Sequence, residues 1–576
     1  MAVIGIDLGT TNSLAAVWKE GEAALIADGL GNLMMPSVVA IDMEGNILTG
    51  QAAKEEELLH PERCASNFKR FMGTEKVYTL ADRKFTPEEL SSLILRRIRA
   101  EAEEFLGEEV TEAVISVPAY FNNDQRYATK LAAELAGIYC ERIINEPSAA
   151  ALTARKTDME GEQLFLVFDF GGGTLDVSIV DCFENIVEIT TIAGDNHLGG
   201  TDFDHAIAQA FCDENGIVWN AMGKKQQTAL LFESRRCKEQ LSLRNDVKME
   251  FEMETGSYAM ELTTEKIFQI GQRLFQRMKN VISKAVRDSG VGLDDITNVL
   301  LAGGSCRMPV VQMFLSRLFG RDVIVGEYPD LLIARGVGIY TGIKERKEEV
   351  KDILMTDVCP FSLGTATAGN VPGDPEKMCM MIERNSILPC HVEMVFTTAG
   401  DYQDKILFKV YQGENYDPEA NLKIGELIIP VAKAPKGEAR VKVAFTYNIN
   451  GILEISAVDC ATKNTVKTTM VSGYKQLSSQ QVAAIKGQME NMKFLSKEQE
   501  ERKAILAMGE RLYAETTGDR RQYVEQAMRY YYHAWYTSSP VQIRKAGKRA
   551  MQMLLNVEVE QNFSVFEDFF DDTDER

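Results

Sequence analysis

Two segments decide the fold: Ile4-Gly5-Ile6-Asp7-Leu8-Gly9-Thr10-Thr11 and Val167-Phe168-Asp169-Phe170-Gly171-Gly172-Gly173-Thr174. Each combines an apolar run, an aspartate and a turn of glycine and threonine, which is the pattern of a strand, a tight turn and a second strand. The two segments form a weak internal repeat. A duplicated hairpin predicts two similar lobes that face each other across a cleft.

The two turns contain the residues needed to hold phosphate. Glycine lacks the Cβ atom that keeps backbone N–H groups away from phosphate oxygens, and the neighbouring threonines add hydroxyl hydrogen bonds. Asp7 and Asp169 would repel a polyphosphate unless both face a hydrated Mg²⁺. Either turn alone is typical of an ordinary loop, whereas the pair predicts a nucleotide cleft. The P-loop pattern GxxxxGK[ST] and a Rossmann GxGxxG after the first strand are both absent, so we expect another nucleotide-binding fold.

Composition narrows the class of partner. The chain has 576 residues, which favours three or four domains, and a formal net charge of −22. That charge argues against nucleic acid and anionic membranes as partners. The ten cysteines show no metal-ligand spacing, which favours reduced thiols in the cytoplasm. No signal peptide and no apolar stretch of about 18 residues is visible, so we expect a cytoplasmic protein without a membrane span.

The pattern of predicted elements divides the chain. Strand-like and helical segments alternate over residues 1–346, which is typical of an α/β fold. A charged run then leads into a predicted junction at 347–358. Short alternating strands with an Asn450-Gly451 hairpin turn predict a β-sandwich over 359–474. Residues 475–576 have a helical composition and end in an acidic tail that contains phenylalanines.

Two helix starts can be predicted within the α/β region. Thr86-Pro87-Glu88-Glu89 combines a capping box with proline at the first helical position. Asn122 or Asn123 can cap a second helix, for which Gly137 is the stop signal.

Further motifs occur in order between the two glycine turns, namely Val117-Pro118-Ala119-Tyr120-Phe121 and Asn145-Glu146-Pro147. Together with the turns they resemble the heat-shock-protein-70 (DnaK-type) chaperones, over residues 1 to about 470. The abbreviated helical end resembles the specialised bacterial HscC-type branch of that family. The resemblance implies an actin-like α/β ATPase domain of two lobes, followed by a β-sandwich peptide-binding domain and a short α-helical lid.

The resemblance also implies a set of nucleotide residues, with ATP or ADP, Mg²⁺ and K⁺ as the cofactors. Lys69 matches the family lysine that positions the attacking water, and a lysine plus Mg²⁺ can offset the charge that develops during hydrolysis. The catalytic set would be Lys69, Glu146, Asp176 and Thr174, and Asp7 and Asp169 would hold Mg²⁺ through water. The residues expected to contact the nucleotide are Asp7, Gly9, Thr10, Thr11, Asn12, Asp169, Gly171, Gly172, Gly173, Gly199, Gly200, Lys238, Ser242, Gly303, Gly304, Ser305, Arg307 and Asp330.

The nucleoside side departs from the family pattern at two positions. Arg235 stands where a glutamate is usual, and Tyr328 replaces the customary asparagine before Pro329-Asp330. Both changes bear on the affinity for the base and on the rate of nucleotide exchange.

A linker between the two predicted domains resembles the family's coupling segment. Ile353, Leu354 and Met355 are apolar, and their exposure would be costly unless they dock in one nucleotide state. The alternative is an edge strand of the sandwich that follows. The resemblance further assigns Pro118 and Arg126 to a relay between cleft and linker. It assigns J-domain docking to Arg142, Asn145 and Asp357.

The sandwich is expected to bind extended apolar peptide by backbone hydrogen bonds and a hydrophobic pocket. Phe396, Ile406 and Phe408 match pocket positions of the family, although apolarity alone would place them in the sandwich core. Ala399 and Ala368 match the arch over the peptide. Ala368 is smaller than the usual residue, so we expect a different client preference.

The partners implied are unfolded or extended client polypeptides, a J-domain co-chaperone and a nucleotide-exchange factor. Other classes share the two turns. An actin-like sugar kinase would need a substrate-facing base and no sandwich, and an actin-type filament protein would also end near the first domain. A nucleotide-exchange-type family member with little ATPase activity is a further alternative, against which Lys69 and the apolar linker count.

Overall fold

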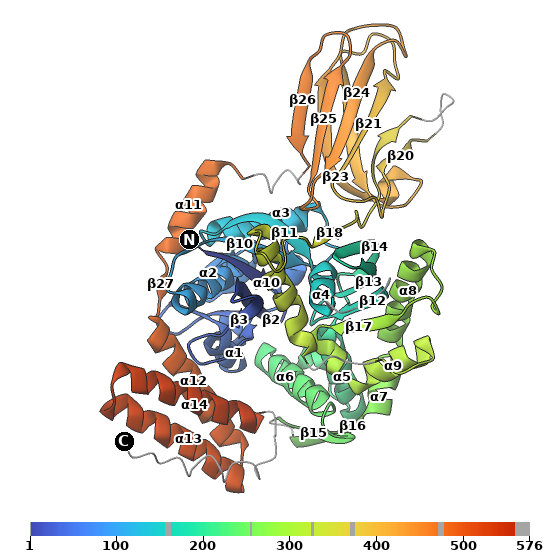
Figure 1. The fold of residues 1–576 in the computed structure, drawn as a ribbon. Coiled ribbons are helices and arrows are strands. Elements are labelled where there is room, and N and C mark those ends of the chain that lie inside the picture. Colours follow the sequence, from blue (N-terminus) through green and yellow to red (C-terminus); the bar gives the residue numbers. More distant parts are fainter. Residues whose placement is uncertain are drawn as a thin grey trace.

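The structure is a computed structural model that describes residues 2–155, 163–253, 256–323, 328–368, 375–470 and 477–558. Two lobes built on sheets form the centre of the molecule, with a β-sandwich attached at one end and a helical bundle at the other (Figure 1). The acidic tail predicted at the end of the chain lies outside the described residues. No helix in the described ranges is long and apolar enough to cross a membrane.

Lobe I is built on a mixed sheet in the order β11-β10-β1-β2-β3. Its first hairpin, β1–β2, is antiparallel, and β1 is parallel to β10. A small sheet with helix α1 stands beside it, and α2 and α3 pack on the main sheet through a shared apolar core. The elements are β1 (Ala2–Asp7), β2 (Asn12–Lys19), β3 (Glu22–Ile26), β5 (Val39–Ile41), β6 (Asn46–Thr49), α1 (Gly50–Leu59), β7 (Cys64–Ala65), α2 (Pro87–Leu106), β10 (Val110–Val117), α3 (Asn123–Leu135) and β11 (Tyr139–Asn145).

Lobe II repeats this pairing. Its sheet has the order β17-β12-β13-β14-β18, with β12–β13 antiparallel and β12 parallel to β17. The structure therefore contains the duplicated hairpin that the sequence predicts. The elements are β12 (Gln163–Phe170), β13 (Leu175–Phe183), β14 (Ile186–Asp195), α5 (Gly200–Asn215), α6 (Lys224–Gln240), β15 (Asp246–Met253), β16 (Gly256–Thr263), α7 (Thr264–Ile270), α8 (Gln272–Ser289), β17 (Asn298–Ala302), α9 (Pro309–Phe319) and β18 (Leu354–Thr356).

Two central helices, α4 (Glu146–Ala154) and α10 (Leu332–Lys344), lie between the sheets (Figure 1). They touch at Gly336, where an added Cβ atom would lie 1.7 Å from the carbonyl oxygen of Ala149. A side chain at this position would force the helices apart, so the glycine is needed for close packing between the lobes.

Both predicted helix starts are confirmed. Thr86 and Glu89 form the capping box of α2, with Pro87 at the first helical position. Asn122 caps α3 by accepting a hydrogen bond from the backbone of Gln125.

The sandwich consists of two four-stranded sheets that enclose a core containing Phe408, Val441, Phe445 and Ile455. The Asn450-Gly451 turn joins β24 to β25, as predicted, and Gly451 has a φ of 67°. The strands are β19 (Leu363–Thr367), β20 (Lys377–Ile382), β22 (Lys405–Gln412) and β23 (Leu422–Pro430) in one sheet, and β21 (Cys390–Thr397), β24 (Arg440–Tyr447), β25 (Leu453–Asp459) and β26 (Thr465–Thr469) in the other.

The C-terminal helices do not lie over the sandwich as a lid. They pack against lobe I, where β27 pairs in parallel with β6 and an apolar core joins α1 to three of the helices (Figure 1). The apolar faces of these helices are therefore covered by lobe I and by one another. The elements are α11 (Ser479–Glu490), β27 (Lys493–Phe494), α12 (Lys497–Glu515), α13 (Gly518–Thr537) and α14 (Pro540–Glu558). We call α12–α14 the bundle.

Candidate nucleotide cleft and its contacts with the sandwich

The two predicted turns meet face to face at the ends of their hairpins. A Cβ atom on Gly172 would lie 2.0 Å from Thr11 Oγ1, and one on Gly173 would lie 2.8 Å from Thr10 Cγ2. Gly9 is equally restricted, because its Cβ would lie 1.9 Å from the carbonyl oxygen of Asn12. The glycines thus allow the turns to approach closely, as the sequence suggests.

A cluster of carboxylates lies beside the turns. Asp7 ends β1, Asp169 lies in β12, Asp176 lies in β13 and Glu146 begins α4; all four are buried. Lys69 Nζ donates a hydrogen bond to Glu146 Oε1 at 2.6 Å. Ser116 Oγ donates to Asp7 Oδ1 at 2.8 Å, and the backbone N–H of Tyr120 donates to Asp176 Oδ1 at 3.2 Å.

The cluster disfavours negative charge. Burial raises the pKa of Asp7 to about 7, with a further increase from the charge of Glu146 and an opposing effect from Lys69. Burial and Glu146 likewise raise the pKa of Asp176 to about 8. The pKa of Asp169 lies well above its ordinary value for the same two reasons. A bound cation would relieve this repulsion and would favour the ionised carboxylates.

Two carboxylate oxygens in the cluster suit a cation and its water shell. Asp169 Oδ2 and Asp176 Oδ2 are buried and have no hydrogen-bond partner among the described residues. Among the residues that the structure describes, no group of three or more His, Cys, Asp or Glu side chains is arranged to hold a metal ion directly. The residues therefore fit a hydrated divalent ion held through water better than one ligated directly by side chains.

Within lobe II, the start of α5 packs against the triglycine turn between β12 and β13. Gly200 N donates to Gly171 O at 3.0 Å, and Thr201 N donates to Gly172 O at 2.9 Å. A Cβ atom on Gly199 would lie 2.4 Å from the backbone of Gly172. The start of α5 therefore lies directly against the turn that the sequence assigns to phosphate.

The predicted nucleoside residues gather beside this contact. Ser305 Oγ donates to Gly171 O at 2.8 Å, and Lys238 Nζ donates to Gly200 O at 3.0 Å. Gly303 and Gly304 pack closely on Phe170 and Asp330, respectively. Arg307 is paired with Asp330 at 2.6 Å.

The unusual residues on the nucleoside side have defined places. Arg235, on α6, pairs with Asp204 at 3.2 Å, and Lys238 pairs with the same carboxylate at 2.6 Å. Tyr328 is exposed, as is Ser242 just beyond the end of α6. The structure therefore brings together most of the predicted nucleotide residues. Ser242 is the exception, because no side-chain contact among the described residues places it in the cleft.

The relay residues connect the cleft domain with the sandwich. Arg126 donates to the side chain of Asn145 at 2.7 Å and to the backbone carbonyl of Asn450 at 3.4 Å. Asn145 and Ser148 both donate to Asp357 Oδ2 at 2.8 Å. Pro118 accepts a backbone hydrogen bond from Phe121 in the loop that carries Tyr120, at 3.0 Å.

The three residues predicted for J-domain docking are buried in this interface. Arg142 donates through Nη1 to the carbonyl of Ile449, and Asn145 donates to Asp357, so these side chains are engaged within the chain. A partner could reach them only if the sandwich moved away. J-domain docking at these residues stays a prediction.

The linker docks on lobe II. β18 extends the lobe II sheet in parallel beside β14, and Leu354 N donates to Asn185 O at 2.8 Å. Ile353 is 5% exposed, whereas Leu354 is 62% exposed and Met355 is partly buried. The segment is an edge strand, but of the lobe II sheet and not of the sandwich. The side chain of Ile353 is buried in this position and that of Leu354 is not, and docking in one nucleotide state stays a prediction.

The predicted peptide residues divide into core and surface positions. Phe408 is buried, and its ring packs edge-on against that of Phe396 at 5.3 Å. Ile406 is partly buried against the sandwich core. Ala368 and Ala399 are exposed, and their place in an arch over the peptide stays a prediction.

Several functional contacts were missed by sequence reasoning. Tyr120 joins Asp176 to the sandwich, because its ring lies 4.3 Å from that of Phe361. Asn450 accepts from Ile143 N at 2.8 Å, although the sequence indicated only a hairpin turn. Tyr120 occurs within a motif already singled out, whereas no short-range signal marks Phe361 or this role of Asn450.

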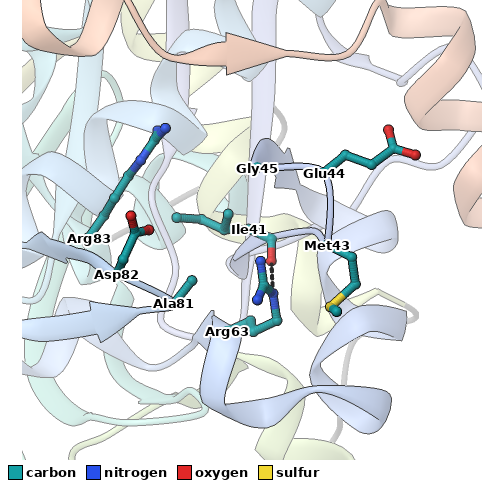
Figure 2. Close-up of a pocket in the computed structure, with 8 residues that line it drawn as sticks. All are labelled: Ile41, Met43, Glu44, Gly45, Arg63, Ala81, Asp82 and Arg83. Atoms are coloured by element: carbon teal, nitrogen blue, oxygen red, sulfur yellow. Dashed lines mark hydrogen bonds between the residues drawn. The ribbon is translucent and has the colours of Figure 1, made fainter.

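A separate hollow opens on lobe I and contains none of the predicted site residues (Figure 2). Arg63 Nε in its wall already donates to Ile41 O at 2.7 Å. The hollow is lined by Ile41, Met43, Glu44, Gly45, Arg63, Ala81, Asp82 and Arg83. It is therefore distinct from the cleft.

Comparison with known families agrees with this architecture. The family model described as "Hsp70 protein" matches residues 3–552. The match includes both lobes, the linker, the sandwich and most of the bundle. Members of this family are chaperones and ATPases. Because the match covers nearly the whole chain, from the two phosphate-type turns to α14, the chain belongs to the Hsp70 family.

Proposed function

We propose that this chain is an ATP-dependent molecular chaperone that captures and releases extended apolar polypeptide segments as ATP is bound and hydrolysed. The contact that carries the proposal is made by Tyr120. Its backbone binds the cleft carboxylate of Asp176, and its ring packs against Phe361 of the sandwich. A change of charge or position at the cleft can therefore reach the sandwich through these two contacts of Tyr120.

The cleft has the chemistry for ATP hydrolysis. The two turns would hold the phosphates, and Asp7 and Asp169 would hold a hydrated Mg²⁺, with K⁺ as a further ion of the site. When bound, Mg²⁺ would neutralise part of the negative charge on the phosphates. Lys69, fixed by Glu146, positions the attacking water together with Thr174 and Asp176. The buried unpartnered oxygens of Asp169 and Asp176 support this assignment.

The assignment of Lys69 can be tested by single-turnover hydrolysis. Lys69→Ala should preserve ATP binding and remove most turnover, because the water loses its positioning group. Lys84→Ala, which changes an exposed lysine of the same lobe, should behave like the unmodified protein. Unchanged hydrolysis in Lys69→Ala would contradict the assignment of Lys69 as the residue that positions the attacking water.

Two further contacts support coupling between cleft and sandwich. The linker strand docks on lobe II through Ile353 and β18. Asp357, directly after this strand, binds Asn145 and Ser148 at the start of α4. Since α4 begins at the cleft residue Glu146, a shift of this helix would alter the linker contact as well. The specialised HscC-type character and the J-domain and exchange-factor partners remain predictions.

The decisive experiment compares ATP turnover with and without an extended apolar peptide. We expect peptide to stimulate turnover in the unmodified chain and to have little effect in Phe361→Ala, which leaves the cleft residues intact. Tyr416→Ala is the matched control, because Tyr416 is an exposed aromatic residue of the same sandwich. Equal stimulation in Phe361→Ala would refute the path through Tyr120. Phosphorylation of a sugar, or polymerisation with ATP, would favour another function.

A further inference from the structure

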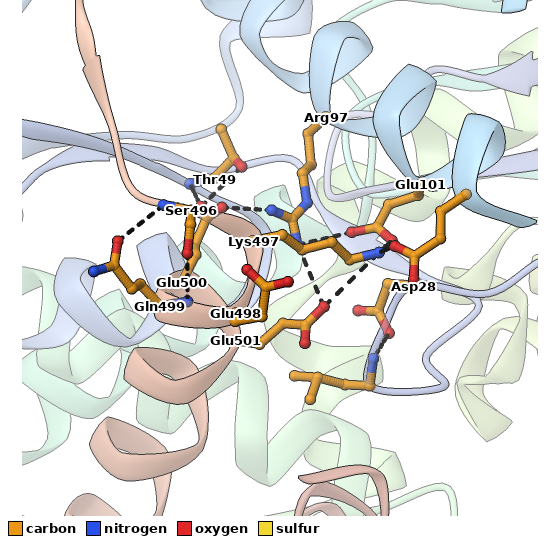
Figure 3. Close-up of polar contacts among 12 residues, drawn as sticks. Asp28, Thr49, Arg97, Glu101, Ser496, Lys497, Glu498, Gln499, Glu500 and Glu501 are labelled. Atoms are coloured by element: carbon orange, nitrogen blue, oxygen red, sulfur yellow. Dashed lines mark hydrogen bonds and ion pairs between the residues drawn. The ribbon is translucent and has the colours of Figure 1, made fainter. Parts of the chain in front are cut away.

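Lobe I covers only part of the bundle surface. On α12, Glu500 accepts hydrogen bonds from Thr49 N at 2.6 Å and from Arg97 Nη1 at 2.7 Å (Figure 3). On α14, Arg544 pairs with Glu104 of lobe I at 2.5 Å. These contacts cover α12 and one side of α14, whereas α13 and the remainder of α14 carry exposed side chains.

The exposed side chains of α13 and α14 are aromatic and basic. The guanidinium of Arg549, on α14, lies over the ring of Tyr530, on α13, at 5.4 Å from the ring centroid. Tyr536 is 74% exposed, and Lys545 lies one helical turn before Arg549. The two helices therefore share one surface, which we call the outer face. It consists of the exposed residues Arg529, Tyr530, His533, Tyr536, Lys545 and Arg549.

The outer face belongs to a basic region of an acidic protein. Residues 518–558 contain seven Lys or Arg and three Asp or Glu, although the whole chain has a net charge of −22. Glu525 is the carboxylate of α13 beside the outer face, and it pairs with Arg529 at 2.6 Å. Tyrosine rings beside lysine and arginine suit a ligand that carries both aromatic and acidic groups.

Residues 559–576, which lie outside the described part of the chain and follow α14 directly, have this composition. They contain four phenylalanines and seven Asp or Glu, against one arginine. Phe563, Phe566 and Phe570 follow the i, i+3, i+7 spacing of one side of a helix, and most of the acidic residues fall on the other side. Aromatic anchors at this spacing are typical of a segment that docks on a helical surface.

The connection is long enough for this segment to reach the outer face. Along α14, Arg549 lies about 14 Å and Lys545 about 20 Å before Glu558, at 1.5 Å per residue. The seven residues 559–565 can span about 23–25 Å when extended. A connection of this length gives an effective concentration in the millimolar range, so a site of weak intrinsic affinity is filled within one chain.

From these features we propose that the outer face is a docking site whose occupant is residues 559–576 of the same chain. The phenylalanines pack on Tyr530 and Tyr536, and the acidic side chains pair with Lys545 and Arg549. This docking goes beyond the proposed function, and it requires neither nucleotide nor client peptide.

Carbodiimide coupling on the full chain tests the contact, because this reagent joins a lysine ammonium group to a carboxylate that already lies beside it. Peptide mass spectrometry should find Lys545 joined to an acidic residue between positions 567 and 575. In a mixture of ¹⁵N-labelled and unlabelled protein, each linked pair should carry a single isotope. Pairs that mix the isotopes would identify a second copy as the occupant and overturn the proposal, as would the absence of any link to Lys545.

The aromatic part of the contact is tested without changing the bundle. Phe566→Ala combined with Phe570→Ala keeps every carboxylate of the segment and removes two of its anchors. We expect the yield of the link to Lys545 to fall about tenfold, because the carboxylates then meet the lysine only as an exposed ion pair. An unchanged yield would overturn the packing of the phenylalanines on the outer face.

The rate at which chymotrypsin cleaves the segment after its phenylalanines gives a second, independent measurement. Lys545→Glu combined with Arg549→Glu should be cleaved roughly tenfold faster than the unmodified chain, since two attractions become repulsions. In 1 M salt the unmodified chain should also be cleaved faster, because the charges are then screened.

Lys433→Glu combined with Lys436→Glu is the matched control, because it makes the same change of charge at two exposed lysines of the sandwich. This variant should be cleaved at the unmodified rate. Equal cleavage of the two double variants would overturn docking on the outer face and leave the chaperone proposal intact.

Discussion

Gly199→Ala tests the packing of α5 against the triglycine turn of lobe II. The added Cβ atom would lie 2.4 Å from the backbone of Gly172, about 1 Å short of ordinary contact. Gly199 has extended backbone angles, with φ of −157° and ψ of −176°, so alanine adds no backbone strain of its own. The effect of the substitution is therefore steric.

The magnitude follows from the contacts that must give way. Overpacking against a rigid backbone costs about 1–3 kcal/mol. Withdrawal of α5 also lengthens the hydrogen bonds from Gly200 N to Gly171 O and from Thr201 N to Gly172 O, each contributing about 1 kcal/mol. If binding requires the closed turn, a total of about 3–5 kcal/mol lowers nucleotide affinity by roughly 100- to 4,000-fold.

Isothermal titration with ADP and Mg²⁺ measures this loss directly. Gly223→Ala is the matched control, because Gly223 also precedes a helix of lobe II and its added Cβ would meet no atom within 4 Å. We expect Gly223→Ala to bind as the unmodified chain does. Equal affinity in Gly199→Ala would mean that the contact between α5 and the triglycine turn does not form part of the nucleotide site.

Three further predictions concern charge and docking. Because the pKa of Asp176 is raised to about 8 from 3.8, the folded nucleotide-free protein binds more protons than the unfolded chain between these values. Its free energy of unfolding should therefore fall as the pH rises from about 4 to 8. Urea titrations at several pH values should show a weaker fall in Asp176→Asn. Equal slopes of unfolding free energy against pH in the two proteins would contradict this. Asn450→Ala removes bonds of 2.8 Å to Ile143 N and to the carbonyl of residue 141, so small-angle scattering should show a less compact chain, with docking weakened by about 2 kcal/mol. Ile353→Asp should release the linker from protease protection, whereas Leu354→Asp should not, since only the first side chain is buried; identical digestion of the two would refute the docking described.

Much of the fold could be predicted because its signals are local. The glycine turns, the Thr86 capping box and the Asn450-Gly451 turn each depend on a few adjacent residues. The close approach of Gly172 to Thr11 follows from the same repeat, once the two hairpins are placed face to face. These features needed no knowledge of distant contacts.

The remaining features depend on residues far apart in the chain. The apolar pattern of Ile353 and Leu354 does not reveal which side chain turns inward, because the docking strand of lobe II decides this. The ring contact between Tyr120 and Phe361 has no counterpart in the local sequence. The bundle was expected to be a lid because of the family resemblance, and its helical composition shows an apolar face but not the surface that covers it.

The attachment of the bundle to lobe I has a consequence for synthesis of the protein. Thr49 and Glu500, which bind each other, are separated by 451 positions. At ordinary rates of translation, about 20–90 s pass between the appearance of these two residues. Throughout that interval the apolar face of α1 and the small sheet lacks its final cover. A growing chain of this chaperone would therefore itself expose, on its first lobe, the kind of surface that chaperones recognise.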